Sequence, residues 1–254
     1  MKLILLLLIL LLIILILRHD KENFTYTPKK IDTAIIFTGY NIDEWDYNFI
    51  KRWYKDTKIY LIYNSDDKSN DKEWLNKISN LKGVTIMERP NIGWDATAWK
   101  DAIVKYYDEL KKYDEVFLMN NSMNYEKIDM KLITELANQY DIYGIYYTQL
   151  TKHIDSYFMG FNKKTFNSKD FKQFYFDSFP LIESHQDAVM KYEMEISNYF
   201  SKLGYKFGSF IADKRPHTNS YMKYPDFVDL DEVRWVTKKA HLKSPNNYKK
   251  WKYL

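Results

Sequence analysis

The stretch RPNIGWDATAWKDA, residues 89–102, places a proline turn, a glycine and an acid at the start of a predicted helix, directly after an apolar run. A loop that leads from a strand into a helix exposes backbone N–H groups, which can bind a phosphate or another polar ligand. Gly93 would let the backbone approach that ligand, and Asn91 and Asp95 could hydrogen-bond to it. The other interpretation is local: Asp95 caps the helix, and Asn91 makes the turn after Pro90. Taken alone, the stretch favours the local interpretation.

Strand and helix patterns alternate on both sides of this stretch. Short apolar runs bounded by turn residues indicate strands at residues 33–40, 58–65, 83–90 and 114–119. Apolar residues at helical spacing indicate helices at residues 43–54, 71–81 and 93–110. These repeated strand–helix units predict an α/β fold with a Rossmann-type, mostly parallel sheet flanked by helices. Ligands are then expected at the carboxyl ends of the strands.

The second half of the chain has a more mixed pattern. Strand-like runs occupy residues 141–148, 153–162 and 205–212. Amphipathic segments at residues 168–179 and 184–204 indicate a short helix and a long one, and the long helix is expected to end at Gly204.

Composition excludes several functions. The 254 residues carry 38 basic and 34 acidic side chains, which interleave along the chain, so no nucleic-acid partner is expected. Cysteine is absent, which removes disulfides, thiolate nucleophiles and Cys-ligated zinc. The five histidines are scattered, and no stretch matches a P-loop, GxGxxG or GxSxG motif.

The amino-terminal residues 1–17 contain an unbroken run of Leu and Ile. We expect a single-pass membrane anchor or a signal helix there, followed by a polar stem at residues 18–30 and one domain at residues 31–254. No Ala, Gly or Ser lies between Leu17 and Pro28, which favours an uncleaved anchor over a removed signal peptide. The side of the membrane stays open, because basic residues flank both ends of the run and Asn23 begins a possible glycosylation tripeptide.

The predicted strand at residues 114–119 runs directly into three small polar residues, Asn120, Asn121 and Ser122. A nucleotide-sugar glycosyltransferase of the A-type (GT-A) fold usually carries an Asp-x-Asp metal motif at this place. Five segments resemble, in the same order, the rhamnan synthesis protein F family. They are residues 89–103, 113–125, 153–174, 189–207 and 234–245, and the resemblance covers roughly residues 31–245.

The resemblance implies a GT-A-like glycosyltransferase that transfers a sugar from a nucleotide-sugar donor to a polysaccharide or glycan acceptor. Rhamnose is often the sugar in this family, so dTDP-rhamnose is a candidate donor. Carried over by position, Asn91, Gly93 and Asp95 would line the donor site, with Asn120, Asn121 and Ser122 near its diphosphate. Further donor-site candidates are Thr38, Gly39 and Asp66. By the same resemblance, His153, Ser156 and Tyr157 belong to the acceptor side. For His153, the alternative is a structural histidine at the start of a strand.

The chain departs from the family at Asn121, where the family usually has an acid. A neutral amide is a poorer ligand than a carboxylate for a hard cation. No metal ligand is therefore assigned and no cofactor is certain, although Mn²⁺ or Mg²⁺ is the candidate. Donor binding is expected to depend weakly on the cation, and Asn121→Asp to increase that dependence.

Alternation along residues 153–162 predicts a single strand. His153, Asp155 and Tyr157 would face one side of it, so that one set of side chains lies in a cleft and the other in the core.

An inverting transferase needs a base that accepts the proton of the attacking acceptor hydroxyl. Many inverting enzymes of this fold carry that acid on a late helix, about three turns before a glycine. Glu193, which precedes Gly204 by 11 positions, is therefore the first candidate base. Asp187 is the second candidate, and Glu195 on the same helix is a further rival.

Two other classes of protein fit the same sequence. A catalytically degenerate transferase that only binds glycans would explain the missing acid at Asn121. A membrane-anchored assembly protein would fit the aromatic-rich composition. Nucleotide-sugar binding and donor hydrolysis by the purified protein distinguish these classes from an active transferase.

Deletion of residues 1–17 is expected to yield a folded, soluble domain, because the apolar run would serve membrane attachment and not the core. Circular dichroism and partitioning between membrane and soluble fractions check this outcome. If the truncated chain fails to fold while the full chain folds, the run belongs to the core.

Overall fold

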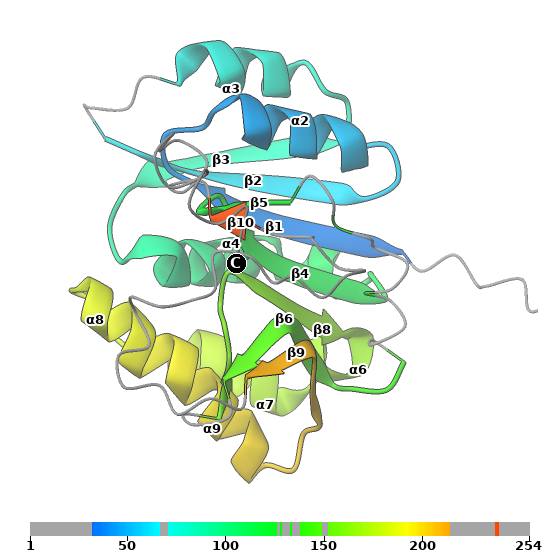
Figure 1. Ribbon diagram of the computed structural model, residues 1–254, viewed down its shortest axis with the longest axis vertical. Helices are drawn as coiled ribbons and strands as arrows, with labels where there is room; N and C mark the ends of the chain where they lie inside the picture. The colour runs from blue at the N-terminus through cyan, green and yellow to red at the C-terminus, as the bar shows by residue number, and fades with distance from the viewer. Residues whose placement is uncertain are drawn as a thin grey trace, which may run out of the picture. The chain divides into compact units, whose positions relative to one another are not determined.

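The computed structural model describes residues 32–66, 71–125, 128, 133, 138–148, 152–213 and 237–238. Its centre is an eight-stranded mixed sheet (Figure 1). Within these described ranges, no helix combines the length and the apolar composition needed to cross a membrane. The expected anchor at residues 1–17 and stem at residues 18–30 lie outside the described residues.

The described strands are β1 (Thr33–Gly39), β2 (Lys58–Ser65), β3 (Val84–Pro90), β4 (Glu115–Asn120), β5 (Met123–Asn124), β6 (Ile142–Thr148), β7 (His153–Ile154), β8 (Phe158–Asn162), β9 (Phe207–Asp213) and β10 (Thr237–Lys238). The described helices are α2 (Glu44–Trp53), α3 (Lys72–Ser79), α4 (Trp94–Leu110), α6 (Lys163–Phe166), α7 (Lys169–Lys172), α8 (His185–Asp187) and α9 (Met194–Lys202), with π-helical turns η1 (Gln173–Asp177) and η2 (Ala188–Glu193).

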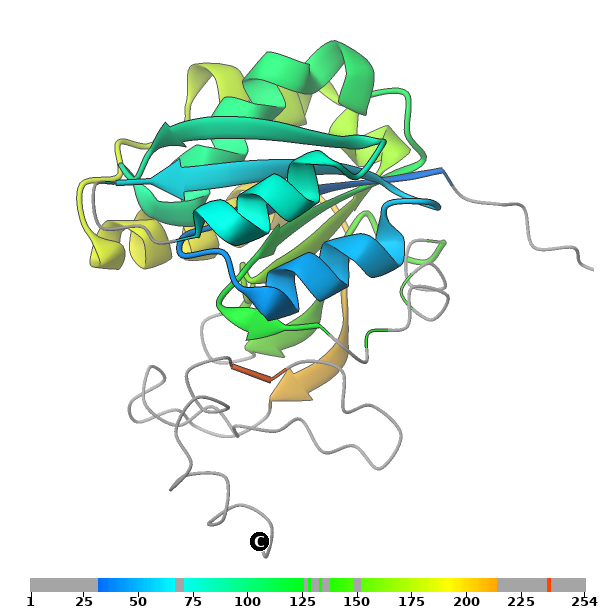
Figure 2. The same ribbon diagram turned by 90° about the horizontal axis from the view of Figure 1, so that it is seen from above.

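The amino-terminal half confirms the expected Rossmann-type arrangement. The strand order of the sheet is β3-β2-β1-β4-β8-β6-β7, and β9 pairs with β6. Strands β3, β2, β1 and β4 run parallel to one another. Helices α2 and α3 cover one face of this part of the sheet, and α4 covers the other (Figure 2). All seven residues of β1 are buried, as a central strand covered on both faces requires. The register places Thr38 beside Asn120, so the carboxyl ends of β1 and β4 meet.

The carboxyl-terminal half contains the antiparallel part of the sheet. Strand β8 is inserted antiparallel between β4 and β6. The single strand expected at residues 153–162 is divided into β7 and β8, so the prediction of one continuous strand was wrong. Gly144 of β6 pairs with Met159 of β8, whereas Tyr147 of β6 pairs with Ile154 of β7. Three residue steps along β6 therefore correspond to five residue steps from β7 to β8. Two extra residues are therefore accommodated as a bulge, which redirects the side chains around it.

The bulge also changes which side chains are buried. Alternation predicted that one set of side chains would face a cleft, but His153, Ile154 and Asp155 are all buried in succession. Ser156 and Tyr157 are half-buried. A strict period of two holds only while the ladder is regular, and here it is interrupted.

The long helix expected at residues 184–204 is present but is not uniform. It consists of α8, the π-helical turn η2 and α9, and Gly204 follows with a positive φ of 82° as expected. The segment expected as a helix at residues 168–179 likewise contains α7 and η1. A π-helical turn inserts one extra residue into a helix and is frequent at functional sites.

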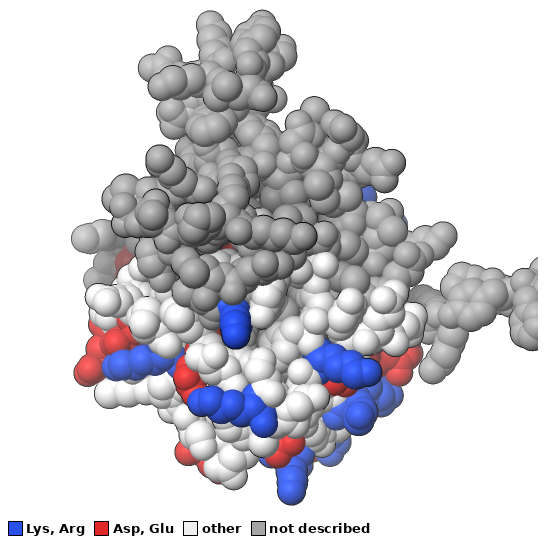
Figure 3. All heavy atoms as spheres, turned by 60° about the horizontal axis from the view of Figure 1, so that its bottom comes forward, with Lys and Arg blue, Asp and Glu red and all other residues white. Residues whose placement is uncertain are grey.

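Basic and acidic side chains lie next to one another on the face that carries the later helices (Figure 3). This mixture follows from the interleaved charges of the sequence. The described part of this face shows no patch of a single sign (Figure 3).

Glu115, at the start of β4, gives the fold a measurable dependence on pH. Its side chain is 5% exposed and accepts a 2.7 Å hydrogen bond from the Tyr143 hydroxyl. Burial raises the pKa of Glu115 to about 8. Between the unfolded pKa of about 4.3 and this value, only the folded protein holds the proton, so its stability falls as the pH rises.

Glu115→Gln is expected to stabilise the protein at pH 8 by about 2–4 kcal/mol, because the amide needs no proton to remain neutral. At pH 5 the variant and the unaltered protein should unfold at nearly the same temperature. Thermal unfolding across this pH range measures the difference, with Glu88→Gln on the exposed side of β3 as control. A difference that stays constant with pH would contradict the assignment.

Candidate functional site

Asp95 joins three elements at the carboxyl edge of the sheet. It lies in the first turn of α4, and its Oδ1 accepts a 3.0 Å hydrogen bond from Thr38 Oγ1 at the end of β1. Its Oδ2 accepts a 2.8 Å bond from Asn120 Nδ2 at the end of β4. Burial raises the pKa of the Asp95 carboxyl, and the bonds from Thr38 and Asn120 oppose that shift. The local interpretation of Asp95 as a helix cap is wrong, since the N-cap residue is Gly93.

The loop before α4 is held by Arg89, which the sequence reasoning did not single out. Its guanidinium donates to Asn64 Oδ1 at 2.7 Å, to the Ile92 carbonyl at 2.7 Å and to Asp101 Oδ2 at 3.0 Å. Gly93 then turns the chain with a φ of 73°, where a side chain would also collide with Thr97. Asn91 is exposed on this loop. The loop is therefore fixed from beneath while its outer side faces solvent.

The three residues after β4 have different surroundings. Asn120 is buried and binds Asp95, and its Oδ1 also accepts from Ser122 Oγ at 2.6 Å. Asn121 points to the loop after β1: its Nδ2 donates to the Tyr40 carbonyl at 2.9 Å and to Asp46 Oδ2 at 3.2 Å. Asn121 therefore connects β4 to α2. Its amide group is therefore used in hydrogen bonds that hold the loop after β1 and helix α2 against β4.

The remaining donor-side candidates lie along the same edge. Gly39 ends β1, and a Cβ there would meet Ile42 and approach the Asn121 side chain. Asp66, after β2, is exposed and accepts a 2.9 Å hydrogen bond from the Tyr40 hydroxyl. Tyr40 thus joins the ends of β1 and β2.

A second group of polar residues surrounds Glu193, the last residue of η2. Glu193 Oε1 accepts a 2.8 Å hydrogen bond from the backbone N–H of Ser156 in the bulge. His153 Nε2 lies 3.9 Å from this oxygen and 3.6 Å from Asp155 Oδ1. The Glu193 side chain is 15% exposed, whereas those of His153 and Asp155 are 8% and 2% exposed. Asp155 is a member of this group that the sequence reasoning did not assign.

The two groups are connected through the bulge. The backbone N–H of Asn120 donates to the Tyr157 carbonyl, and Ser156, the neighbour of Tyr157, donates to Glu193. The Trp99 ring lies 5.9 Å from that of Tyr192, the residue before Glu193, and its Nε1 donates to the Met119 carbonyl. The expected donor and acceptor sides therefore meet at the end of β4.

Asp187 occupies a structural position at the start of the late helix. Its backbone N–H bonds to Ser184 Oγ, its carboxylate accepts from the Glu183 N–H, and Lys191 pairs with it at 2.9 Å. The bond from Lys191 lowers the pKa of Asp187. Glu195 is exposed on α9. Of the three acids proposed as bases, Glu193 contacts the bulge that leads to Asn120.

His153, Asp155 and Glu193 are also the described residues whose ligand atoms are close enough to hold a cation, all within 4.8 Å of one another. The end of β4 offers a different set of groups, namely the amides of Asn120 and Asn121 and the hydroxyl of Ser122. Hard cations prefer charged oxygen ligands, so these three residues do not fit a metal site of the Asp-x-Asp type.

Comparison with known proteins identifies relatives of the chain. A family model described as Rhamnan synthesis protein F matches residues 59–249, more than half of the chain. The Uncharacterized protein y4gN of Sinorhizobium fredii (strain NBRC 101917 / NGR234) is 24% identical over 161 residues, which span 61% of this chain and 41% of that relative. The match therefore covers less than half of the relative's length.

Solved structures with a similar arrangement include two proteins that handle nucleotide sugars by name. The mannosyltransferase PcManGT from Pyrobaculum calidifontis, in complex with GDP-Man and Mn²⁺, is 11% identical with a TM-score of 0.49, over 80% of this chain and 63% of that chain. A nucleoside-diphosphate-sugar pyrophosphorylase from Vibrio cholerae RC9 is 10% identical with a TM-score of 0.48, over 86% and 98%. At these scores the likeness assigns no activity.

The contacts of Asn121 change the expectation for Asn121→Asp. A carboxylate at this position would lose the bond donated to Tyr40 and would face the Asp46 carboxylate. We expect a loss of about 1–3 kcal/mol in unfolding free energy in place of a gained cation site. Denaturant unfolding checks this, with Asn91→Asp on the exposed loop as the chemically matched control. Unchanged stability combined with new Mn²⁺ binding would contradict it.

Proposed function

This chain belongs to the rhamnan synthesis protein F family, and we propose that it is a membrane-anchored glycosyltransferase of the GT-A type. It transfers a sugar from a nucleotide-sugar donor to a polysaccharide or other glycan acceptor. The observation that carries this proposal is the junction at the end of β4. There the Asp95 group and the Glu193 group are joined through Asn120, Tyr157 and Ser156.

The donor is assigned to the side of Asp95. Backbone N–H groups at the start of α4 and the αL turn at Gly93 suit a diphosphate or a polar sugar. The Arg89 guanidinium is buried and hydrogen-bonds to Asn64 and Asp101. It therefore fixes the shape of the loop and is not exposed to the donor. Ser122 and Asn91 are exposed near the same edge and supply further hydrogen-bonding groups. Because rhamnose is often the sugar in this family, dTDP-rhamnose is the first donor to test.

The acceptor is assigned to the side of Glu193, which acts as the general base. Its carboxylate accepts the proton of an acceptor hydroxyl while that oxygen bonds to the anomeric carbon and the bond from that carbon to the diphosphate breaks. Attack from the face opposite the leaving group inverts the configuration. The Ser156 N–H orients the carboxylate. His153 and Tyr157 are proposed to line the acceptor side.

We expect only a weak dependence on Mn²⁺ or Mg²⁺. The amides at the end of β4 are poor cation ligands, and a cation held by His153 and Asp155 would also recruit the proposed base, Glu193. Complete loss of donor binding in a chelator would contradict this part of the proposal. Attachment to a membrane is proposed for residues 1–17 because of their unbroken Leu and Ile run.

Glu193→Gln is expected to lower the transfer rate by about 10²–10⁴-fold, because the amide keeps the shape but cannot accept a proton. Donor affinity should change little, since the base faces the acceptor. Asp95→Asn should instead weaken donor binding, because an amide cannot accept hydrogen bonds from both Thr38 and Asn120 as the carboxylate does. Transfer kinetics and donor titration by calorimetry separate the two effects.

Glu195→Gln, on the exposed side of α9, is the matched control and should retain normal turnover. If Glu193→Gln keeps near-normal turnover while Asp187→Asn or Glu195→Gln abolishes it, the base lies elsewhere on the helix. If the protein binds donor and glycan but neither hydrolyses nor transfers the sugar, it is the degenerate glycan-binding protein and not an enzyme.

A further inference from the structure

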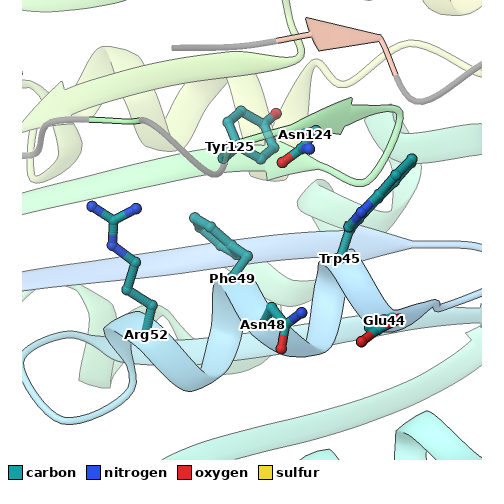
Figure 4. A pocket seen from close by; sticks show the side chains of 7 residues that line it. All are labelled: Glu44, Trp45, Asn48, Phe49, Arg52, Asn124 and Tyr125. Carbon is teal, nitrogen blue, oxygen red and sulfur yellow. The ribbon is translucent and has the colours of Figure 1, made fainter. Parts of the chain in front are cut away.

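A pocket of about 420 Å³ lies between α2 and the residues Asn124 and Tyr125 at the end of β5 (Figure 4). Its volume is within the range of about 300–1,000 Å³ that is typical of small-molecule sites. The pocket is lined from α2 and from Asn124 and Tyr125. Neither Asp95 nor Glu193 lines it, so it is distinct from the groups described above.

Three residues of α2 share the side of the helix that faces this pocket. Trp45, Phe49 and Arg52 rise from the helix towards Asn124 and Tyr125 (Figure 4). They are four and three positions apart, the spacing that places side chains on one side of a helix. Phe49 is buried and stacks on Phe37, whereas Trp45 is half-buried and Arg52 is exposed. The pocket therefore has an apolar floor and a polar rim.

The chemistry of the lining indicates a neutral ligand with many hydroxyl groups. Aromatic ring faces carry partial negative charge and pack well against C–H groups, such as those on one face of a sugar ring. The rim adds one carboxylate, Glu44, one guanidinium, Arg52, and the amide of Asn48. These groups can both donate to and accept from hydroxyls. Because the two charges are opposite, the lining favours neither a phosphate nor a cation.

The pocket adjoins the site at the end of β4 through hydrogen bonds. The Tyr125 hydroxyl donates to the Tyr157 carbonyl, which also accepts from the Asn120 N–H. On the other side, Asp46, the neighbour of Trp45, accepts from Asn121. Both walls of the pocket are thus bonded to residues at the junction of the donor and acceptor sides.

We propose that this pocket binds a neutral sugar unit of the acceptor glycan, at a distance from the unit that reacts. The proposal rests on the proposed function for the identity of the acceptor, but sugar binding in the pocket does not depend on catalysis. Longer acceptors would then bind more tightly than short ones, because they reach Trp45 and Asn48.

The test is direct binding of glycans to the full-length protein without donor. The probes are neutral tetrasaccharides of rhamnose, mannose, galactose or glucose, each compared with its monosaccharide by calorimetry. We expect at least one tetrasaccharide to bind more tightly than its monosaccharide. Trp45→Ala should weaken that binding by about tenfold or more, and Trp45→Phe should restore part of it.

Two further variants separate binding from folding. Asn48→Ala changes an exposed side chain of the pocket and should weaken tetrasaccharide binding without altering the unfolding temperature. Trp74→Ala is the matched control, because Trp74 packs on Tyr47 and Lys77 outside the pocket. It should leave glycan affinity unchanged.

The outcomes distinguish this proposal from the proposed function. If no transfer is found but Trp45→Ala and Asn48→Ala abolish tetrasaccharide binding, the pocket is assigned correctly and the activity is not. If the protein transfers sugar in a Glu193-dependent way while both variants bind every tetrasaccharide like the unaltered protein, the pocket proposal is wrong. Equal affinity of the unaltered protein for tetrasaccharides and monosaccharides would also overturn it.

Discussion

The carboxylate of Asp95 is the constraint on which the rest of the site depends. A partly buried acid is costly to desolvate, and here that cost is offset by two hydrogen bonds, from Thr38 and Asn120. These bonds come from the ends of two adjacent parallel strands, so a single side chain sets the position of α4 against both. The αL turn at Gly93 and the buried Arg89 set the shape of the loop that leads into α4.

The group around Glu193 is built from two irregularities that compensate for each other. The bulge between β7 and β8 turns the Ser156 N–H out of the regular ladder, where it would otherwise pair with a neighbouring strand. The π-helical turn η2 ends at Glu193 and shifts the following face of the helix relative to a regular α-helix. The two meet in the hydrogen bond from Ser156 to Glu193. Either irregularity alone would leave a backbone donor or an acid without this partner.

The sequence predicts the parallel half of the fold well, because each strand there is a compact apolar run and each helix has a clear start. It also singles out Asp95 and Glu193, which the structure connects through Asn120, Tyr157 and Ser156, whereas their roles stay predictions. It does not predict that Arg89 anchors the loop, since that depends on Asn64 and Asp101 from other elements. Nor does it predict the bulge, because the alternation of residues 153–162 is that of an ordinary strand. The structural use of Asn121 depends on Asp46, which is distant in the sequence.

The antiparallel insertion of β8 has a consequence for synthesis of the chain. Strand β4 is buried along its whole length and is mostly apolar. One of its edges pairs with β1, and the other pairs with β8, which is made later in the chain. A ribosome completes β4 at residue 120 but begins β8 only at residue 158. In that interval the nascent chain exposes an unpaired apolar strand edge, which is a template for pairing with other chains. The strand order itself therefore sets when this edge of β4 becomes paired during synthesis.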